Sequence, residues 1–230
     1  MTANPKYHMD DIFNLETAHP DEAHSIIMRE IPENSRVLEL GSASGYLSGY
    51  MEQKLGCRVT GLEFDENATR IAAERTSEVY TVDLDAEDAL TVANDSAPYD
   101  VFLAAAILEH LKYPERLLQN AREMLNDDAL IIVSLPNVAY WQVRLKLLMG
   151  NFDYEEYGVM DKTHLKLYTR KTGQELLEQN GYHVFDFKTA GSMIQQMANR
   201  IARATGNSSA PQILPGLFGY ELIYFARPKK

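Results

Sequence analysis

Short apolar runs alternate with amphipathic stretches along almost the whole chain. The apolar runs predict seven strands: RVLEL (36–40), RVTGLE (58–63), EVYTVD (78–83), YDVFLAA (99–105), ALIIVSLP (129–136), HVFDFKT (183–189) and YELIYFAR (220–227). Helical spacing of apolar residues recurs at about 20–31, 45–55, 66–75, 114–125, 137–149, 170–180 and 192–204. We therefore predict an α/β fold, a Rossmann-like doubly wound seven-stranded sheet. It is mostly parallel, with the last strand antiparallel and helices on both faces.

No internal repeat or low-complexity segment interrupts this alternation, so we expect one domain over residues 1–230. Within it, residues 1–34 are expected to form an N-terminal helical segment or lid. Residues 35–135 are the predicted cofactor-binding half, and 136–230 are the predicted substrate-side half. An insert at 191–216 contains the loop-like stretch GNSSAPQILPG.

Composition narrows the classes of partner. The net charge is −11, from 22 basic and 33 acidic residues, which argues against a surface that follows nucleic-acid phosphates. The only cysteine, Cys57, cannot form an internal disulfide, and no apolar run has the length of a signal sequence or a membrane span. We expect a cytoplasmic monomer or homodimer that acts on a small molecule and binds neither nucleic acid nor a membrane.

The stretch LELGSASGY, residues 38–46, places small residues where the first predicted strand ends. Glu39, Gly41, Ala43 and Gly45 alternate along it. Doubly wound sheets bind ligands at the carboxyl ends of their strands, near the point where the strand order reverses. A ligand lying against bare backbone would explain the small residues, and so would a tight turn from strand to helix.

Three nucleotide-binding patterns compete for this bend. A dinucleotide site has the form G-x-G-x-x-G, which is absent, and a phosphate loop needs Gly-Lys-Ser/Thr, although the first lysine after the bend is Lys54. ELGSASG instead matches Glu/Asp-x-Gly-x-Gly-x-Gly, the nucleoside-binding loop of S-adenosylmethionine-dependent methyltransferases, with Ala43 in place of the middle glycine.

Acidic residues also end the next two predicted strands. Glu63 is placed to accept hydrogen bonds from ribose hydroxyls, and Asp83 to accept from an adenine amino group with Leu84 packed on the ring. Asp85 competes with Asp83, because a shift of two residues keeps the same side of a strand. Each acid taken alone is also typical of a solvated strand end.

Longer stretches give a resemblance to class I S-adenosylmethionine-dependent methyltransferases. They are VLELGSASG, YDVFLAAAILEHLKYPERLLQNAREML, IIVSLPNVAYWQVRLKLLMGNFDYEEYGVMDKTHLKLYTRKT and LLEQNGY. The chain most resembles the MetW-like group and related domains found with glycan-modifying enzymes. The resemblance implies S-adenosylmethionine as cofactor and S-adenosylhomocysteine as product.

The resemblance also assigns the cofactor contacts. Glu39 and Gly41 would line the methionine end, Glu63 would hold the ribose, and Asp83 with Leu84 would hold the adenine. The predicted cofactor-binding set is completed by Ala43, Gly45, Tyr46, Phe64 and Ala104. Two positions depart from the family's residue pattern. Ala43 replaces a glycine and narrows the loop, and Ala106 stands where relatives often carry an aspartate.

Candidate catalytic residues are His110, His164 and Asp161. His110 follows the fourth strand and has a suitable ordinary pKa of about 6.5 for a general base, although packing of the loop explains it equally well. Asp161 lies three residues before His164 and would orient its ring if the segment turns, but a structural role is favoured. A metal bound by Glu109 and His110 would need further ligands that the sequence does not identify, so we expect no metal.

Aromatic residues gather around the expected pocket mouth and would wall it or pack in the core: Tyr7, Tyr46, Phe64, Tyr140, Trp141, Phe152, Tyr154 and Tyr157. In the helix near 192–204, one face carries Ile194, Met197, Ala198 and Ile201, which favours core packing or a dimer face over a substrate lid. The sequence favours an enzyme acting on a hydroxylated or carboxylated metabolite. A cofactor-binding partner subunit without turnover is the alternative.

Overall fold

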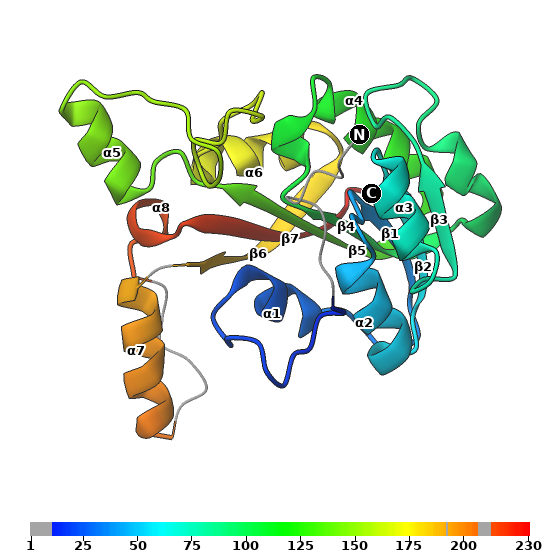
Figure 1. Cartoon of the computed structure of the whole chain (residues 1–230), viewed down its shortest axis with the longest axis horizontal. Helices are drawn as coiled ribbons and strands as arrows, with labels where there is room; N and C mark the ends of the chain where they lie inside the picture. Colours follow the sequence, from blue (N-terminus) through cyan, green and yellow to red (C-terminus); the bar gives the residue numbers. More distant parts are fainter. Residues whose placement is uncertain (1–10, 192, 207–212) are drawn as a thin grey trace.

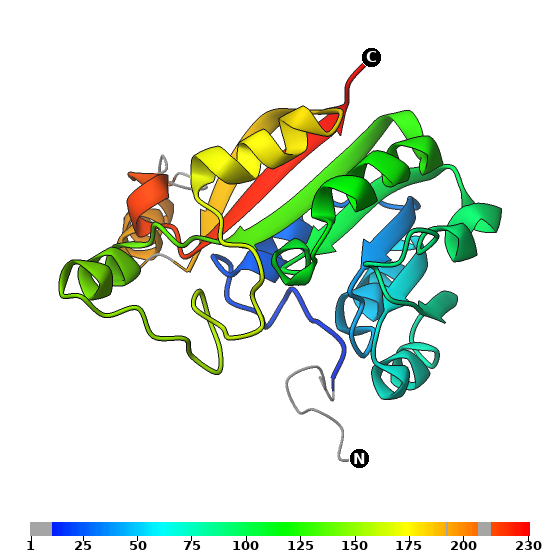
Figure 2. The same ribbon diagram turned by 90° about the horizontal axis from the view of Figure 1, so that it is seen from above.

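A seven-stranded sheet runs through the computed structural model, which describes residues 11–191, 193–206 and 213–230. Its strand order is β3-β2-β1-β4-β5-β7-β6 (Figures 1 and 2). The strands are β1 (Arg36–Leu40), β2 (Arg58–Glu63), β3 (Glu78–Thr81), β4 (Tyr99–Ala105), β5 (Leu125–Pro136), β6 (Tyr182–Ala190) and β7 (Glu221–Pro228).

The strand directions agree with the sequence prediction. Strands β1 to β5 pair in parallel, and β7 pairs antiparallel with both β5 and β6. The order reverses between β1 and β4, which neighbour each other although two strands separate them in sequence. The carboxyl ends of β1 and β4 therefore form the crevice in which this type of sheet binds ligands.

Helices cover both faces of the sheet. They are α1 (Ala23–Met28), α2 (Tyr46–Leu55), α3 (Glu66–Ala72), α4 (Pro114–Ala121), α5 (Trp141–Leu148), α6 (Arg170–Gln179), α7 (Met193–Ala204) and α8 (Pro215–Phe218). One core cluster joins α4 and α6 to the sheet through residues such as Leu118 and Leu177. The other joins α1 and α2 through residues such as Ile27 and Met51. Among the described residues, no helix combines the length and apolarity needed to cross a membrane.

Some boundaries differ from the prediction because backbone groups pair across the chain. The helix expected from 137 begins only at Trp141, since Asn137 N donates to Tyr220 O and Val138 N to Tyr168 O. Strand β5 begins at Leu125 instead of 129. Short 3₁₀ helices that the sequence did not predict are η2 (Thr91–Ser96), η3 (Leu108–His110) and η4 (Arg122–Met124).

Helix α7 is turned the opposite way from a core helix. Its apolar residues Met197 and Ile201 are 67% and 61% exposed, whereas the polar Gln195 and Asn199 are buried. Asn199 Nδ2 donates to Asp21 Oδ1 over 2.9 Å, which ties the polar face to the N-terminal segment. The core-packing interpretation of this stripe is therefore wrong, and its apolar face points to solvent. In Figure 1 the helix stands away from the sheet.

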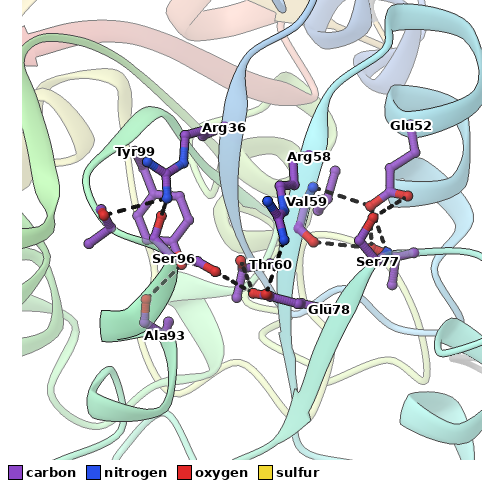
Figure 3. A network of polar contacts seen from close by, with 12 residues as sticks. Arg36, Glu52, Arg58, Val59, Thr60, Ser77, Glu78, Ala93, Ser96 and Tyr99 are labelled. Atoms are coloured by element: carbon purple, nitrogen blue, oxygen red, sulfur yellow. Dashed lines mark hydrogen bonds and ion pairs between the residues drawn. The ribbon is translucent and has the colours of Figure 1, made fainter.

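A polar network fastens the amino ends of the strands (Figure 3). Glu78 Oε2 accepts hydrogen bonds from Thr60 Oγ1 over 3.0 Å and from Ser96 Oγ over 2.6 Å, and Arg58 lies 3.9 Å from the Glu78 carboxylate. Next to it, Glu52 accepts from Ser77 N over 2.7 Å. These groups stabilise the amino ends of the strands, which lie opposite the bend at residues 38–46. The carboxyl ends of the strands carry that bend.

Candidate functional site

A pocket of about 660 Å³ opens at the carboxyl ends of β1, β2 and β4. This size suits a small ligand or cofactor. Eight of the ten predicted cofactor-binding residues line it: Glu39, Gly41, Ala43, Tyr46, Glu63, Phe64, Asp83 and Leu84. His24, Ser42, Leu47, Asp65, Asp85, Ala105, Ala106, Ile107, His110 and Leu111 complete its wall. The alternation of small residues and strand-end acids in the sequence thus converges on one cavity.

Two predicted residues lie elsewhere. Ala104 is a fully buried residue of β4 that packs in the first core cluster, and the residues that reach the pocket are its successors Ala105 and Ala106. A Cβ atom on Gly45 would lie 3.0 Å from Ala72 Cα, so this glycine allows α2 and α3 to pack closely. Ala104 and Gly45 therefore do not line this pocket, and their predicted contact with the cofactor stays a prediction.

The bend from β1 to α2 is built from left-handed backbone. The φ angles are +67° at Gly41, +48° at Ala43 and +73° at Gly45. Gly41 N donates to Leu62 O over 2.7 Å, and a Cβ on Gly41 would come within 2.9 Å of the Ile107 side chain. The small residues therefore serve the tight turn as well as the pocket, and both explanations of the bend apply.

Glu39 is buried at the floor of the pocket. It is 3% exposed, and its Oε2 accepts a hydrogen bond from the hydroxyl of Ser48. Burial raises the pKa of Glu39 from 4.5 to about 8; the Ser48 hydrogen bond lowers it, and the negative charge of Glu63 raises it further. A positively charged ligand group beside this carboxylate would favour its ionised form.

Glu63 organises the bend from the end of β2. Its Oε1 accepts from the backbone amides of Phe64 and Asp65, each over 2.9 Å, and its Oε2 accepts from Ala43 N over 2.8 Å. A carboxylate offers about four acceptor positions, so these contacts leave roughly one on the pocket side. The residue is therefore both a loop anchor and a potential acceptor for a ligand hydroxyl.

Asp83 and Asp85 divide two roles between them. Asp85 Oδ1 accepts from Lys112 N over 2.9 Å and from Tyr113 N over 3.1 Å, which anchors the start of α4. Asp83 Oδ1 accepts only a local hydrogen bond from Asp85 N among the contacts described. Both line the pocket, but Asp83 has the greater capacity left to accept from a ligand.

Three polar side chains meet at one side of the pocket. His110 lines the pocket, and the His164 ring lies behind it with the ring centroids 4.8 Å apart. His164 Nε2 is 3.9 Å from Oε1 of Glu109, which is 1% exposed. The fold thus brings His164 next to Glu109 and His110, although His164 lies more than fifty residues after them in the sequence. This proximity could not be read from the sequence.

Asp161 supports the turn that carries His164. Its Oδ1 accepts from Thr163 N over 2.8 Å and from Thr163 Oγ1 over 2.6 Å. The His164 ring is oriented by the Val159 carbonyl, which lies 3.1 Å from its Nδ1. Neither Asp161 nor His164 lines the pocket itself. Asp161 therefore holds the turn that places His164, while a catalytic part for either residue stays a prediction.

The predicted aromatic wall is only partly present. Tyr46 and Phe64 line the pocket, whereas Tyr140 packs against Tyr220 and is buried. The other described members lie outside the pocket and are exposed: Trp141, Phe152, Tyr154 and Tyr157. Tyr7 is outside the described residues. Sequence reasoning missed His24, which α1 brings to the pocket because α1 packs against α2 in the second core cluster.

Strand order, pocket position and acid set together define a class I S-adenosylmethionine-dependent methyltransferase. The donor set fits this cofactor, because Glu39 can face a cation while Glu63 and Asp83 can accept from hydroxyl and amino groups. The chain belongs to the family described as a methyltransferase domain, which it matches over residues 18–186. Its cofactor is S-adenosylmethionine.

Known relatives are distant. The chain is 27% identical to a ubiquinone biosynthesis O-methyltransferase of Glaesserella parasuis, over 44% of this chain and 45% of that one. It thus spans less than half the length of that relative. It is 22% identical to the enzyme of the same name from Coxiella burnetii, over 68% of this chain and 70% of that one. A solved S-adenosylmethionine-dependent methyltransferase from Methanosarcina mazei shares the fold, with a TM-score of 0.62, 14% identity, and coverage of 90% of this chain and 99% of that one.

Proposed function

We propose that this methyltransferase moves a methyl group to an oxygen of a small hydroxylated or carboxylated metabolite, sugar-derived acceptors included. The observation that carries the proposal is the position of His110, which lines the same pocket as the proposed cofactor contacts Glu39, Glu63 and Asp83. A proton-binding side chain at this place can act on an acceptor hydroxyl next to the cofactor.

The bound cofactor supplies a methyl group on a sulfonium, which in-line displacement transfers to a nucleophile. The chain's own residues would bind the cofactor, orient the acceptor and keep water out of the pocket. Asp83 and Leu84 would hold the adenine, Glu63 a ribose hydroxyl, and Glu39 the cationic methionine end. His24 and Tyr46, whose rings lie 5.7 Å apart, would form part of a cover from the N-terminal segment.

His110 is oriented for acid–base work. Its Nδ1 lies 3.2 Å from Thr163 O, so in the neutral ring Nδ1–H donates to that carbonyl and Nε2 carries the lone pair. An oxygen acceptor needs such help, because a hydroxyl is a weak nucleophile until it loses its proton. Most of the similar curated proteins are named O-methyltransferases and one is a phosphoethanolamine N-methyltransferase, so the names favour oxygen as the acceptor atom.

A second function fits the exposed helix α7. A MetW-like partner subunit would bind the cofactor without turnover and use an exposed apolar face to contact an enzyme. The face formed by Ile194, Met197 and Ile201 is 41% to 67% exposed, which is unusual for so many apolar residues of one helix. The same face would serve equally well in a homodimer.

Methyl-labelled cofactor tests the proposal. Incubation with a panel of hydroxylated and carboxylated metabolites is expected to move the label to a small molecule. His110→Ala should lower turnover by about 10²–10⁴ without weakening cofactor binding. If that variant loses melting temperature but keeps its turnover per folded molecule, the histidine only packs. Recovery of a stoichiometric enzyme by pull-down, with no label moved, would favour the partner subunit.

A further inference from the structure

Glu109, His110 and His164 have the composition of a metal site. One ligand atom from each of the three side chains lies within 4.8 Å of the others. Two donors bound about 2.0–2.2 Å from one Zn²⁺ ion are themselves about 3.3–3.6 Å apart in tetrahedral geometry. His164 Nε2 and Glu109 Oε1 are 3.9 Å apart, and no two ligand atoms of the set are more than 4.8 Å apart. Each atom would therefore need to move by less than about 1 Å to reach coordination distance.

The surroundings of both histidines supply an independent observation. His110 Nδ1 lies 3.2 Å from Thr163 O, and His164 Nδ1 lies 3.1 Å from Val159 O. Metal-binding histidines almost always donate their second ring N–H to a carbonyl or a carboxylate, which fixes the tautomer and orients the lone pair toward the ion. Here both rings have such a carbonyl, and Asp161 holds the Thr163 turn that supplies one of them.

The backbone fixes these parts relative to one another. Glu109 O accepts from Leu165 N over 2.8 Å and from Lys166 N over 3.0 Å, which locks the segment that carries His164 onto η3. The site is therefore assembled by two segments that are joined independently of any ion. The three side chains are therefore held close together by the backbone before any ion binds.

We propose that Glu109, His110 and His164 bind a divalent ion of the zinc type at the edge of the cofactor pocket. Imidazole nitrogen favours zinc and its transition-metal neighbours over Mg²⁺, which prefers oxygen ligands. Three protein ligands leave a coordination position for another molecule, as in catalytic zinc sites. His110 lines the pocket, so the ion would lie in the wall of the cavity that holds the proposed cofactor contacts.

This inference rests on the proposed oxygen acceptor and assigns its activation to the ion. An acceptor hydroxyl that reaches the ion becomes more acidic, and its proton leaves to solvent. The oxygen–methyl bond then forms as the sulfur–methyl bond breaks, and the sulfonium becomes a neutral thioether. With the ion bound, the His110 lone pair is used in coordination, so the ion replaces His110 in lowering the pKa of the acceptor hydroxyl, and the Glu109 carboxylate compensates part of the charge of the ion.

Metal binding can be measured without cofactor or acceptor. Protein stripped with a chelator is titrated with Zn²⁺ in a calorimeter, and with Co²⁺ by its visible absorption. One ion per chain is expected to bind. His164→Ala and Glu109→Gln should each weaken binding at least about tenfold, while His183→Ala, which changes an exposed histidine on β6, should not.

The outcomes separate this inference from the proposed function. No Zn²⁺ or Co²⁺ binding by a folded, stripped wild type overturns the metal site, and so does equal weakening by His183→Ala. If labelled methyl transfer then persists in chelator, the oxygen-methyltransferase proposal stands without the metal. If the ion binds as expected but no acceptor takes the label, the site stands and the proposed function fails. Melting temperatures of the variants identify any change that merely unfolds the protein.

Discussion

Burial sets the protonation state of Glu39. With its pKa raised to about 8 in the folded protein, against 4.5 ordinarily, the folded state holds a proton that the unfolded state has lost between these values. The contribution of Glu39 to stability is therefore complete below pH 4.5 and declines as the pH rises through about 8. The ionised form of Glu39, which suits a cationic ligand, is therefore the form that burial disfavours.

Cofactor binding should for this reason release a proton at neutral pH. We expect affinity for S-adenosylmethionine to rise by up to about tenfold per pH unit between pH 6 and 7, because ionised Glu39 is the form that binds. Calorimetry in buffers of different ionisation enthalpy measures the proton directly. Glu39→Gln should bind more weakly and lose this pH dependence. An unchanged pH dependence in that variant would show that another group titrates.

For single residues, the sequence predicted which strand-end acids lie at the pocket but not which of them hold backbone amides. Glu39, Glu63 and Asp83 were predicted because each ends a strand of a parallel sheet, and all three line the pocket. The capping of the Lys112 and Tyr113 amides by Asp85 depends on a contact across 27 residues, which no local pattern encodes. The meeting of His164 with Glu109 is of the same long-range kind.

At the scale of elements, the bend at residues 41–45 was the most informative local signal. Its small residues were explained either by a tight strand-to-helix turn or by a ligand site; the turn is present, and Gly41 and Ala43 also line the pocket. The pattern could not tell which glycine serves the pocket and which serves helix packing, because that depends on where α3 lies. For helix α7, the sequence pattern predicted the wrong face to be buried. Its apolar stripe predicted a buried face, but the hydrogen bonds of Asn199 and Arg203 to Asp21 turned the polar face inward.

Substitutions at two glycines with similar backbone angles can distinguish the cost of lost helix packing from the cost of backbone strain. Gly45 and Gly150 have φ angles of +73° and +83°, but only at Gly45 would a Cβ meet the α3 backbone. Gly150→Ala should cost about 1–2 kcal/mol of unfolding free energy, and Gly45→Ala should cost more. Denaturant unfolding measures both, and cofactor affinity per folded molecule should be unchanged. Equal losses would contradict the packing role, and weaker binding in Gly45→Ala would return this residue to the site.

In the whole molecule, the polar network that stabilises the sheet and the pocket lie at opposite ends of the strands. The network around Glu78 (Figure 3) lies at the amino ends of the strands. The pocket lies at their carboxyl ends. The hydrogen bond from Ser96, with those from Thr60 and the charges of Arg58 and Arg36, lowers the pKa of Glu78 despite partial burial. Its stabilising contribution is therefore present above pH 4.5 and is lost as the pH falls through the lowered pKa.

Glu78→Ala should accordingly reduce stability and leave the site intact. The loss of two hydrogen bonds to a carboxylate is expected to cost about 1–3 kcal/mol at pH 7, and the difference from wild type should shrink in acid. Thermal unfolding from pH 7 down to pH 3 checks this expectation. A fall in cofactor affinity of the folded variant would mean that the two edges are coupled.

We propose that the pocket at the carboxyl ends of the strands binds S-adenosylmethionine through its strand-end acids. Calorimetric titration of the wild type, Asp83→Asn and Asp85→Asn with this cofactor measures that binding. Saturable binding of one molecule per chain is expected. Asp83→Asn should weaken binding by about 1–3 kcal/mol, while Asp85→Asn should lower the melting temperature and leave affinity close to that of the wild type. No binding by folded wild type at millimolar cofactor, or weakening confined to Asp85→Asn, would show that the strand-end acids do not hold the cofactor in this way.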